Sequence, residues 1–162
     1  MQILKDHQIK QKIRRLAIEI LERNTTVSAL TIVGVNRNGM YFANMIADEL
    51  ARLSPLPITR THVHLSPANP LESPITTGLP LSDFAGKAIL VVDDVANTGR
   101  TLFYACKPFM DVLPLKIETA VLVDRTHKSF PIKVDYYGIS LATTLMDNIQ
   151  LNYLQKKNWL LL

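Results

Sequence analysis

Three short, mainly apolar runs, rich in β-branched residues, are separated along the chain by segments with helical spacing. They are Leu30–Val35, Ala88–Val92 and Ile117–Val123, and residues 135–139 are a further short strand or strand end. Strands that are apolar along their whole length are typically buried on both faces, as in parallel sheets covered by helices. The sequence therefore predicts an α/β fold with a mostly parallel sheet flanked by helices. Its 162 residues suit a single domain spanning residues 1–162.

Three segments have the spacing of amphipathic helices. The first covers residues 7–23, is capped by Asp6 and repeats apolar side chains at helical intervals from Ile9 to Ile20. The second is predicted from Met40 to Leu53, after a polar turn at residues 36–39. The third covers residues 102–113, where Pro108 is expected to end its first half or to kink it.

Residues 54–83 differ from the rest of the chain because they hold six of its nine prolines. Ile58–Leu65 is a candidate strand, whereas residues 66–82 resist regular structure. Loops of this length inside compact domains are usually functional covers or disordered segments. Residues 62–82 are therefore a candidate lid over a site, and an inert insertion is the alternative.

Charge and cysteine content restrict the possible partners and compartments. The net charge of +4 permits an anionic partner without requiring one, and the cationic face Lys10, Lys12, Arg14 and Arg15 is either solvated or a polyanion stripe. The single cysteine, Cys106, fits a buried position in a reducing compartment. No apolar stretch reaches the ~20 residues of a membrane span, so a soluble, cytoplasmic protein without a membrane partner is expected.

The most informative motif follows the second apolar run. Two adjacent carboxylates, Asp93 and Asp94, precede a short loop with Gly99 and two threonines, after which a helix is predicted. Backbone N–H groups at such a loop bind anions, whereas the carboxylates suit a polyol, a metal ion or a developing cation. A ligand with a phosphate at one end and a hydroxylated sugar beside it satisfies both halves. The motif is neither a Walker loop nor a glycine-rich dinucleotide fingerprint.

This motif resembles the 5-phosphoribosyl-1-pyrophosphate (PRPP) signature of type I phosphoribosyltransferases. The resemblance implies that Asp93 and Asp94 contact the ribose hydroxyls and that the following loop holds the 5-phosphate. It also implies a pyrophosphate loop with Mg²⁺ near the first strand, the metal being held mainly by PRPP and water, with Asp93 and Asp94 as its protein ligands. The implied phosphate residues are Ala96, Asn97, Thr98, Gly99, Arg100 and Thr101, and the implied pyrophosphate residues are Val35, Asn36, Arg37, Asn38 and Gly39.

Further segments resemble the PyrR family, whose members attenuate pyrimidine operons and have uracil phosphoribosyltransferase activity. They are residues 3–24, residues 34–43 and the pair of segments 120–128 and 131–138. The resemblance implies the type I phosphoribosyltransferase fold with a small hood and a mobile loop. It further implies that Tyr136 stacks on the nucleobase and that the Tyr137 backbone reads the edge of the base.

The implied activity is transfer of a phosphoribosyl group from PRPP to a nucleobase, with uracil and pyrimidine salvage as the first expectation. One alternative is an RNA-binding attenuator of pyrimidine genes, for which Arg14, Arg15, His127, Lys128 and Lys133 could contact phosphates. The other is a catalytically degenerate protein that only binds PRPP or a nucleotide. A homo-oligomer, a dimer or larger, is expected in each case.

The chain departs from the family pattern in three places. The pyrophosphate loop reads Arg37-Asn38-Gly39 where PyrR proteins have Thr-Arg-Gly, so its charge lies one position earlier. The lid region reads His62-Val63-His64-Leu65-Ser66-Pro67 in place of a Tyr-Arg-Asp type segment, so it lacks the family's clamping charges. The sequence after Gly138 also differs, and the apolar end of residues 150–162 is expected to pack on the body or on a neighbouring subunit.

Overall fold

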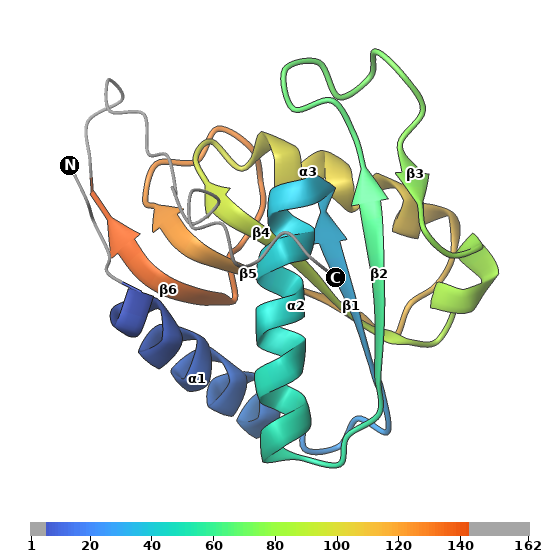
Figure 1. Ribbon diagram of the computed structural model, residues 1–162. Helices are drawn as coiled ribbons and strands as arrows, with labels where there is room; N and C mark the ends of the chain where they lie inside the picture. Colours follow the sequence, from blue (N-terminus) through green and yellow to red (C-terminus); the bar gives the residue numbers. More distant parts are fainter. Residues whose placement is uncertain (1–5, 143–162) are drawn as a thin grey trace.

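The computed structural model describes residues 6–142, whose strands form one six-stranded sheet (Figure 1). The strand order is β3-β2-β1-β4-β5-β6, and every neighbouring pair is parallel except β2 and β3. The strands are β1 (Leu30–Val35), β2 (Ile58–His64), β3 (Thr76–Thr77), β4 (Ala88–Ala96), β5 (Lys116–Arg125) and β6 (Tyr136–Leu141). The predicted α/β fold with a mostly parallel sheet is confirmed.

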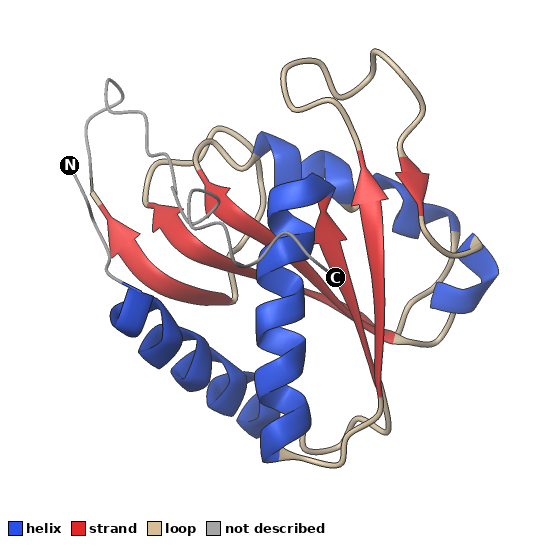
Figure 2. Cartoon of the chain, viewed as in Figure 1, coloured by secondary structure: helices blue, strands red, loops and turns tan. Residues whose placement is uncertain are grey.

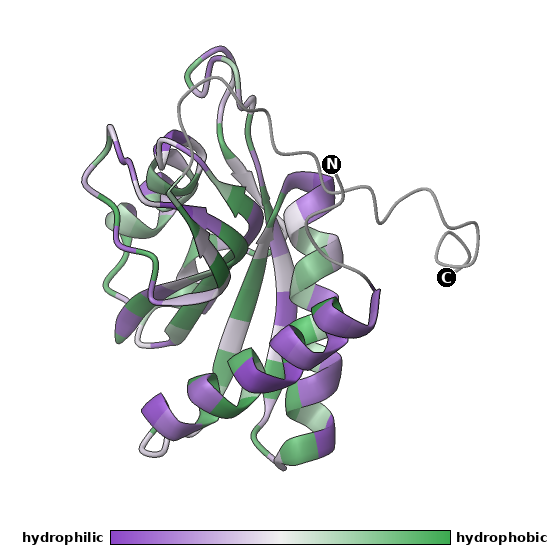
Figure 3. Cartoon of the chain, turned by 90° about the vertical axis from the view of Figure 1, so that its left-hand side faces the viewer, coloured by the Kyte–Doolittle hydropathy of each residue, from purple (hydrophilic) through white to green (hydrophobic). Residues whose placement is uncertain are grey.

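Helices cover both faces of the sheet, as Figure 2 shows. The long helices α1 (Asp6–Arg23) and α2 (Asn36–Leu53) share one apolar core with β1, β4, β5 and β6. The short helix α3 (Arg100–Ala105) and the 3-10 helices η1 (Leu81–Phe84) and η2 (Lys107–Asp111) line a second core on the opposite face. The central strands are largely green in the hydropathy view, whereas α1 shows purple on its outer side (Figure 3). The apolar runs therefore form strands because two layers of helix remove both of their faces from water.

On either side of the boundary between β1 and β4, the chain connections run in opposite directions along the sheet. The chain passes from β1 through α2 to β2 on one side, and from β4 through α3 to β5 on the other side (Figure 1). Open α/β sheets bind ligands at this point, in the crevice beyond the carboxyl ends of the two central strands. The topology therefore directs attention to the residues that follow Val35 and Val92.

Two predicted boundaries at this crevice are wrong. Helix α2 begins at Asn36 and not at Met40, because Asn36 adopts a left-handed φ of 53° and turns the chain directly from strand into helix. Strand β4 continues to Ala96 and not only to Val92, because it pairs with β5 as far as Asp124. Asp93 and Asp94 are therefore strand residues, and the loop between β4 and α3 is only residues 97–99.

The proline-rich segment is more ordered than predicted. Thr76–Thr77 forms an antiparallel edge strand against Val63 and His64, so the irregular stretch shortens to residues 65–75, called here the 65–75 loop. The expected break at Pro108 is confirmed, since α3 ends at Ala105 and η2 carries this proline in its first turn. Cys106 between them is buried, as predicted. The segment of residues 150–162 lies outside the described residues.

Candidate active site

The two carboxylates of β4 occupy different environments. Asp93 is 7% exposed, whereas Asp94 is partly exposed, and successive strand residues point to opposite faces of the sheet. The Asp93 Oδ1 atom accepts a hydrogen bond of 2.8 Å from the backbone N–H of Asp94, and Asp94 Oδ1 accepts one of 2.9 Å from Val95. These backbone bonds fix both carboxyl groups at the carboxyl end of β4.

The pKa of Asp93 is raised well above its ordinary value. Burial is the largest cause, because it disfavours the charged form, and the neighbouring charge of Asp94 adds to it. A cationic ligand would relieve both effects, since it would compensate the buried charge. Among residues 6–142 no group of three or more His, Cys, Asp or Glu side chains could hold a metal ion. The carboxylate oxygens of Asp93 and Asp94 are the type of ligand that Mg²⁺ prefers, so the pair fits a hydrated Mg²⁺ that takes its other oxygen ligands from a substrate and water.

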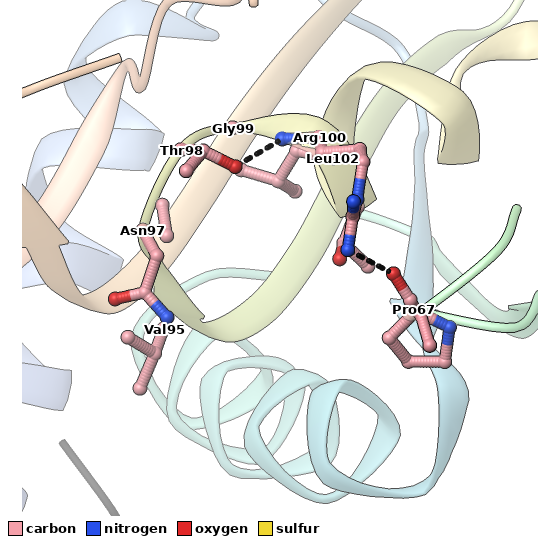
Figure 4. Close-up of a pocket in the computed structure, with 10 residues that line it drawn as sticks. Pro67, Val95, Asn97, Thr98, Gly99, Arg100 and Leu102 are labelled. Atoms are coloured by element: carbon pink, nitrogen blue, oxygen red, sulfur yellow. Dashed lines mark hydrogen bonds between the residues drawn. The ribbon is translucent and has the colours of Figure 1, made fainter. Parts of the chain in front are cut away.

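A cavity of about 430 Å³ lies directly beyond β4 (Figure 4). It is bounded by residues 95–102, which run from the end of β4 into the first turn of α3, and, on the opposite side, by Pro67 and Ala68 of the 65–75 loop. Within the first wall the Thr98 hydroxyl oxygen accepts a hydrogen bond of 3.4 Å from the Arg100 N–H. The structure thus places Ala96, Asn97, Thr98, Gly99, Arg100 and Thr101 along one hollow, where backbone N–H groups can bind an anion.

Gly99 determines the course of this loop. It adopts a φ of +84°, and a Cβ atom at this position would lie 2.5 Å from Ile132 Cγ2 in the segment between β5 and β6. That segment, residues 126–135, is called here the hood loop. Its Ser129 and Phe130 N–H groups donate to the Thr98 carbonyl oxygen at 2.9 and 3.2 Å. The hood loop therefore packs against the loop that contains Thr98 and Gly99, and only glycine at position 99 leaves room for this contact.

Gly99→Ala is expected to lower the melting temperature by about 4–8 °C, because left-handed strain and the clash with Ile132 together cost about 2 kcal/mol. Gly86→Ala is the matched control, since Gly86 also has a positive φ, of +69°, but has no atom within 4 Å of the added Cβ. Differential scanning calorimetry should show a smaller decrease for Gly86→Ala. Equal decreases would contradict a packing role for Gly99.

The residues after β1 lie beside the same carboxylates. Asn38 Nδ2 donates to Asp94 Oδ2 at 3.3 Å, and a Cβ atom on Gly39 would lie only 2.6 Å from the Val92 carbonyl oxygen. The missing side chain of Gly39 therefore lets the first turn of α2 approach β4. Arg37 is exposed on this turn, and the Asn36 Oδ1 atom accepts a hydrogen bond of 3.0 Å from the N–H of Leu65. The predicted pyrophosphate segment from Val35 to Gly39 and the two aspartates thus form one cluster.

The structure does not support the predicted stacking role of Tyr136. This side chain is fully buried against α1, and its hydroxyl donates to Glu118 Oε2 at 2.7 Å and accepts from Asn24 Nδ2 at 3.3 Å. Arg23 lies 5.0 Å above the ring. Tyr136 begins β6 level with Ala120 and Val92, in the middle of β5 and β4, and its side chain belongs to the core shared with α1 and α2. Its ring has no free face for a base because alternation along β6 directs it into the core.

Tyr137 lies on the other face of β6 and is 43% exposed. Its carbonyl oxygen accepts a hydrogen bond of 3.4 Å from Arg15 Nη2, which also donates to the Gly138 carbonyl at 2.7 Å. Tyr137 pairs with Val121, which itself pairs with Asp93, so the three residues lie at one level of the sheet. The structure thus places Tyr137 level with the carboxylates and two strands away.

Sequence reasoning missed the contacts that connect the loops around the site. Lys128 Nζ donates to Asp124 Oδ1 at 2.6 Å and to the Arg125 carbonyl oxygen, and Arg125 Nη1 donates to Asn97 Oδ1 at 3.4 Å. The Arg100 guanidinium donates to the Pro67 carbonyl oxygen at 2.8 Å. The spacing of Asp124 and Lys128 is a weak signal of pairing, whereas nothing in the sequence relates Arg100 to a backbone oxygen 33 residues away.

Comparison with known proteins agrees with this geometry. Residues 1–152 match the model of the phosphoribosyl transferase domain family. The chain is 34% identical over 156 residues to the bifunctional protein PyrR of Halalkalibacterium halodurans, a match that covers 91% of this chain and 87% of that protein. It is 34% identical over 148 residues to the corresponding protein of Enterococcus faecalis, covering 87% of this chain and 83% of that protein.

Solved structures with the same fold include the hypoxanthine phosphoribosyltransferase of Trypanosoma cruzi. That likeness has a TM-score of 0.72 at 19% identity and covers 86% of this chain and 80% of that chain. A hypoxanthine-guanine phosphoribosyltransferase from Bacillus anthracis gives a TM-score of 0.69 at 19% identity, with the same two coverages. At this identity the two structures show the fold alone. In the described part of the chain, no helix combines the length and apolarity that a membrane span needs.

Proposed function

The chain belongs to the phosphoribosyltransferase domain family and, within it, to the PyrR proteins, and from this premise we propose that it transfers a phosphoribosyl group from PRPP to uracil. The observation that carries the proposal is the cavity of about 430 Å³. Its wall of residues 95–102 directly follows Asp93 and Asp94 of β4. This juxtaposition suits a substrate with a phosphate on one side and ribose hydroxyls on the other. Pyrophosphate is the leaving group.

In the proposed complex the 5-phosphate occupies the cavity. Backbone N–H groups of the loop from Asn97 to Thr101 and the hydroxyls of Thr98 and Thr101 are its donors. Because the hood loop rests on the Thr98 carbonyl, this loop is held in place before the substrate binds. Preorganised donors avoid the reorganisation that a mobile loop would need.

Asp93 and Asp94 are proposed to accept hydrogen bonds from the ribose hydroxyls. As the bond to pyrophosphate breaks, positive charge develops on the ribose ring, and two carboxylates at fixed positions stabilise that charge. The raised pKa of Asp93 means that this carboxyl group is poorly compensated when the site holds no cation. It therefore interacts most favourably with the positive charge that develops on the ribose ring, or with a cation that accompanies the substrate.

The turn from Val35 to Gly39 is proposed to face the leaving pyrophosphate. Asn38 connects this turn to Asp94, so the two ends of the reacting bond are positioned by groups in contact with each other. Arg37, exposed on the same turn, supplies a positive charge. Mg²⁺, when bound, would neutralise charge on the diphosphate, and Asp93 and Asp94 are the side chains that would hold it, directly or through water.

The nucleobase is proposed to bind beside Tyr137, where its edge can pair with backbone groups of β6 and the hood loop. The exposed side of Tyr137 lies level with Asp93, which supports this placement. Tyr136 is left out of this proposal because its ring is buried. The choice of uracil rests on the relationship to PyrR proteins and not on a contact in the cavity.

The test is a turnover assay with PRPP and Mg²⁺ against uracil, orotate, guanine, hypoxanthine, xanthine and adenine in parallel. Pyrophosphate release that depends on uracil supports the proposal, and release with another base would correct the choice of substrate. If no base gives turnover but PRPP still raises the melting temperature, the protein is a binder without chemistry. That result would reject the enzymatic assignment.

A second candidate function is RNA binding, which we propose because the curated relatives are named bifunctional proteins. The available cationic surface is smaller than the sequence suggested, because Arg15 binds backbone carbonyls and Lys128 is largely buried in its pair with Asp124. Lys10 and Arg14 remain exposed on α1. Binding of pyrimidine-operon leader RNA that weakens steeply with salt would support this function, and absent or salt-insensitive binding would reject it.

We also propose a cytoplasmic homo-oligomer. Burial of the single cysteine suits a reducing compartment, and burial raises the pKa of the Cys106 thiol to about 11, which keeps it unreactive. Met110, Leu113 and Leu115 are exposed apolar side chains at or near the connection between η2 and β5, which supports self-association. Light scattering coupled to size exclusion would show a monomer if this is incorrect.

A further inference from the structure

The 65–75 loop carries almost no charge of its own. Residues 65–80 contain a single charged side chain, Glu72, and no lysine or arginine. The loop nevertheless forms one wall of the cavity through Pro67 and Ala68. A cover over an anionic substrate therefore has to be positioned by groups from outside the loop.

Two side chains from different elements beside the site reach the first residues of this loop. Arg100, at the start of α3, donates from Nη2 to the Pro67 carbonyl oxygen at 2.8 Å (Figure 4). Asn36, at the start of α2, accepts the Leu65 N–H on Oδ1 at 3.0 Å. Arg100 belongs to the loop proposed to hold the 5-phosphate, and Asn36 belongs to the turn proposed to face pyrophosphate. The two ends of a bound substrate are thus connected to the same short segment of chain.

Contacts inside the 65–75 loop stiffen it, so that fixing its first residues also positions the rest. Asn69 N–H donates to Ser66 Oγ at 3.4 Å and Glu72 N–H donates to the Asn69 carbonyl at 3.0 Å, while Pro70 is buried. Three prolines within residues 65–75 also restrict the backbone. A segment with internal turns and restricted φ moves as a unit more readily than a flexible chain. Fixing residues 65–67 therefore fixes the wall of the cavity.

We propose that Arg100 and Asn36 are positioning residues that tether the 65–75 loop over the site, with Arg100 supplying the cation that the loop lacks. The proposal rests on the proposed function for its consequence, exclusion of water from PRPP, but the tether itself is independent of any turnover. Water exclusion matters because PRPP can lose pyrophosphate to water as well as to a base. Arg100 is not assigned a step in the chemistry.

Hydrogen exchange followed by mass spectrometry on the full chain without ligand tests the tether directly. Arg100→Gln is expected to speed exchange in the 65–75 loop roughly fivefold, because one charge-assisted hydrogen bond is lost. Asn36→Gly should also speed exchange at Leu65, since glycine keeps the positive φ but removes the accepting oxygen. Arg52→Gln, which removes an exposed arginine paired with Glu49 on α2, should leave the loop unchanged.

A second measurement compares hydrolysis of PRPP with transfer to the base. In Arg100→Gln the ratio of hydrolysis to transfer is expected to rise several-fold, with partial recovery in Arg100→Lys. If exchange in the loop of Arg100→Gln equals that of the wild type, the tether is rejected even where activity falls, because Arg100 then acts on the phosphate alone. If no base is turned over, the exchange result still decides the tether while the proposed function fails.

Discussion

Asp93→Asn is expected to lower kcat for phosphoribosyl transfer about 10²–10³-fold while raising the melting temperature of the ligand-free protein. The first effect follows from the loss of a fixed negative charge beside the developing positive charge of the ribose, a change that typically has this magnitude. The second follows from burial, because the ionised carboxyl group is 7% exposed and adjacent to Asp94. Function and stability are thus expected to change in opposite directions at one residue.

The stability gain has a defined pH dependence. The folded-state pKa of Asp93 lies above the ordinary value, so the folded protein retains this proton over a range in which the unfolded chain has lost it. The stability due to this group is fully present below the unfolded pKa and is lost as the pH rises through the folded pKa. The gain from Asp93→Asn should therefore be absent near pH 4 and reach about 1–2 kcal/mol, or about 3–6 °C, at higher pH.

Asp94→Asn is the control for this prediction. Asp94 is partly exposed, so its replacement should lower kcat by a similar factor but give a smaller gain in melting temperature. Thermal unfolding from pH 4 to pH 8 and steady-state kinetics on the same preparations provide the comparison. A melting temperature of Asp93→Asn below that of the wild type at every pH would show that burial does not strain this carboxylate.

Tyr136→Ala is expected to lower the free energy of unfolding by about 3–5 kcal/mol, because it empties the space of a fully buried aromatic side chain. Tyr136→Phe should cost about 1–2 kcal/mol, since it removes the hydroxyl that bonds Glu118 and Asn24 but keeps the ring. Chemical denaturation measures both changes. The neighbouring Tyr137→Ala, at an exposed position, should change stability by less than about 1 kcal/mol.

Steady-state kinetics of a Tyr136 variant distinguish a packing role of this residue from a role in base binding. Tyr136→Leu keeps an apolar side chain in the core but removes the aromatic face. If Tyr136 is a core residue, the KM for the nucleobase should stay within about twofold of the wild type while stability falls. A KM that rises tenfold or more would restore the stacking role, because base–aromatic stacking contributes about 1–3 kcal/mol.

Predictions of secondary structure from the sequence were most accurate where one physical preference dominates a segment. The apolar runs at residues 30–35, 88–92 and 117–123 could be assigned to buried parallel strands, since residues of this type in a run have few other stable environments. The predicted boundaries of β4 and α2 were wrong, because contacts or conformations set by the tertiary structure overrode local preference. Pairing with β5 extends β4 through two charged residues, and the αL conformation of Asn36 starts α2 one turn early.

The sequence by itself determined the class of fold and the adjacency of two carboxylates to a loop with the features of an anion site. These depend on residue type and short spacing, which are written in consecutive residues. Only the tertiary structure decided that Tyr136 faces the core, that Asn38 meets Asp94, and that Arg100 holds the carbonyl of Pro67. Such contacts join residues far apart in the chain, and they depend on how strands align and how closely loops approach, which no local preference encodes.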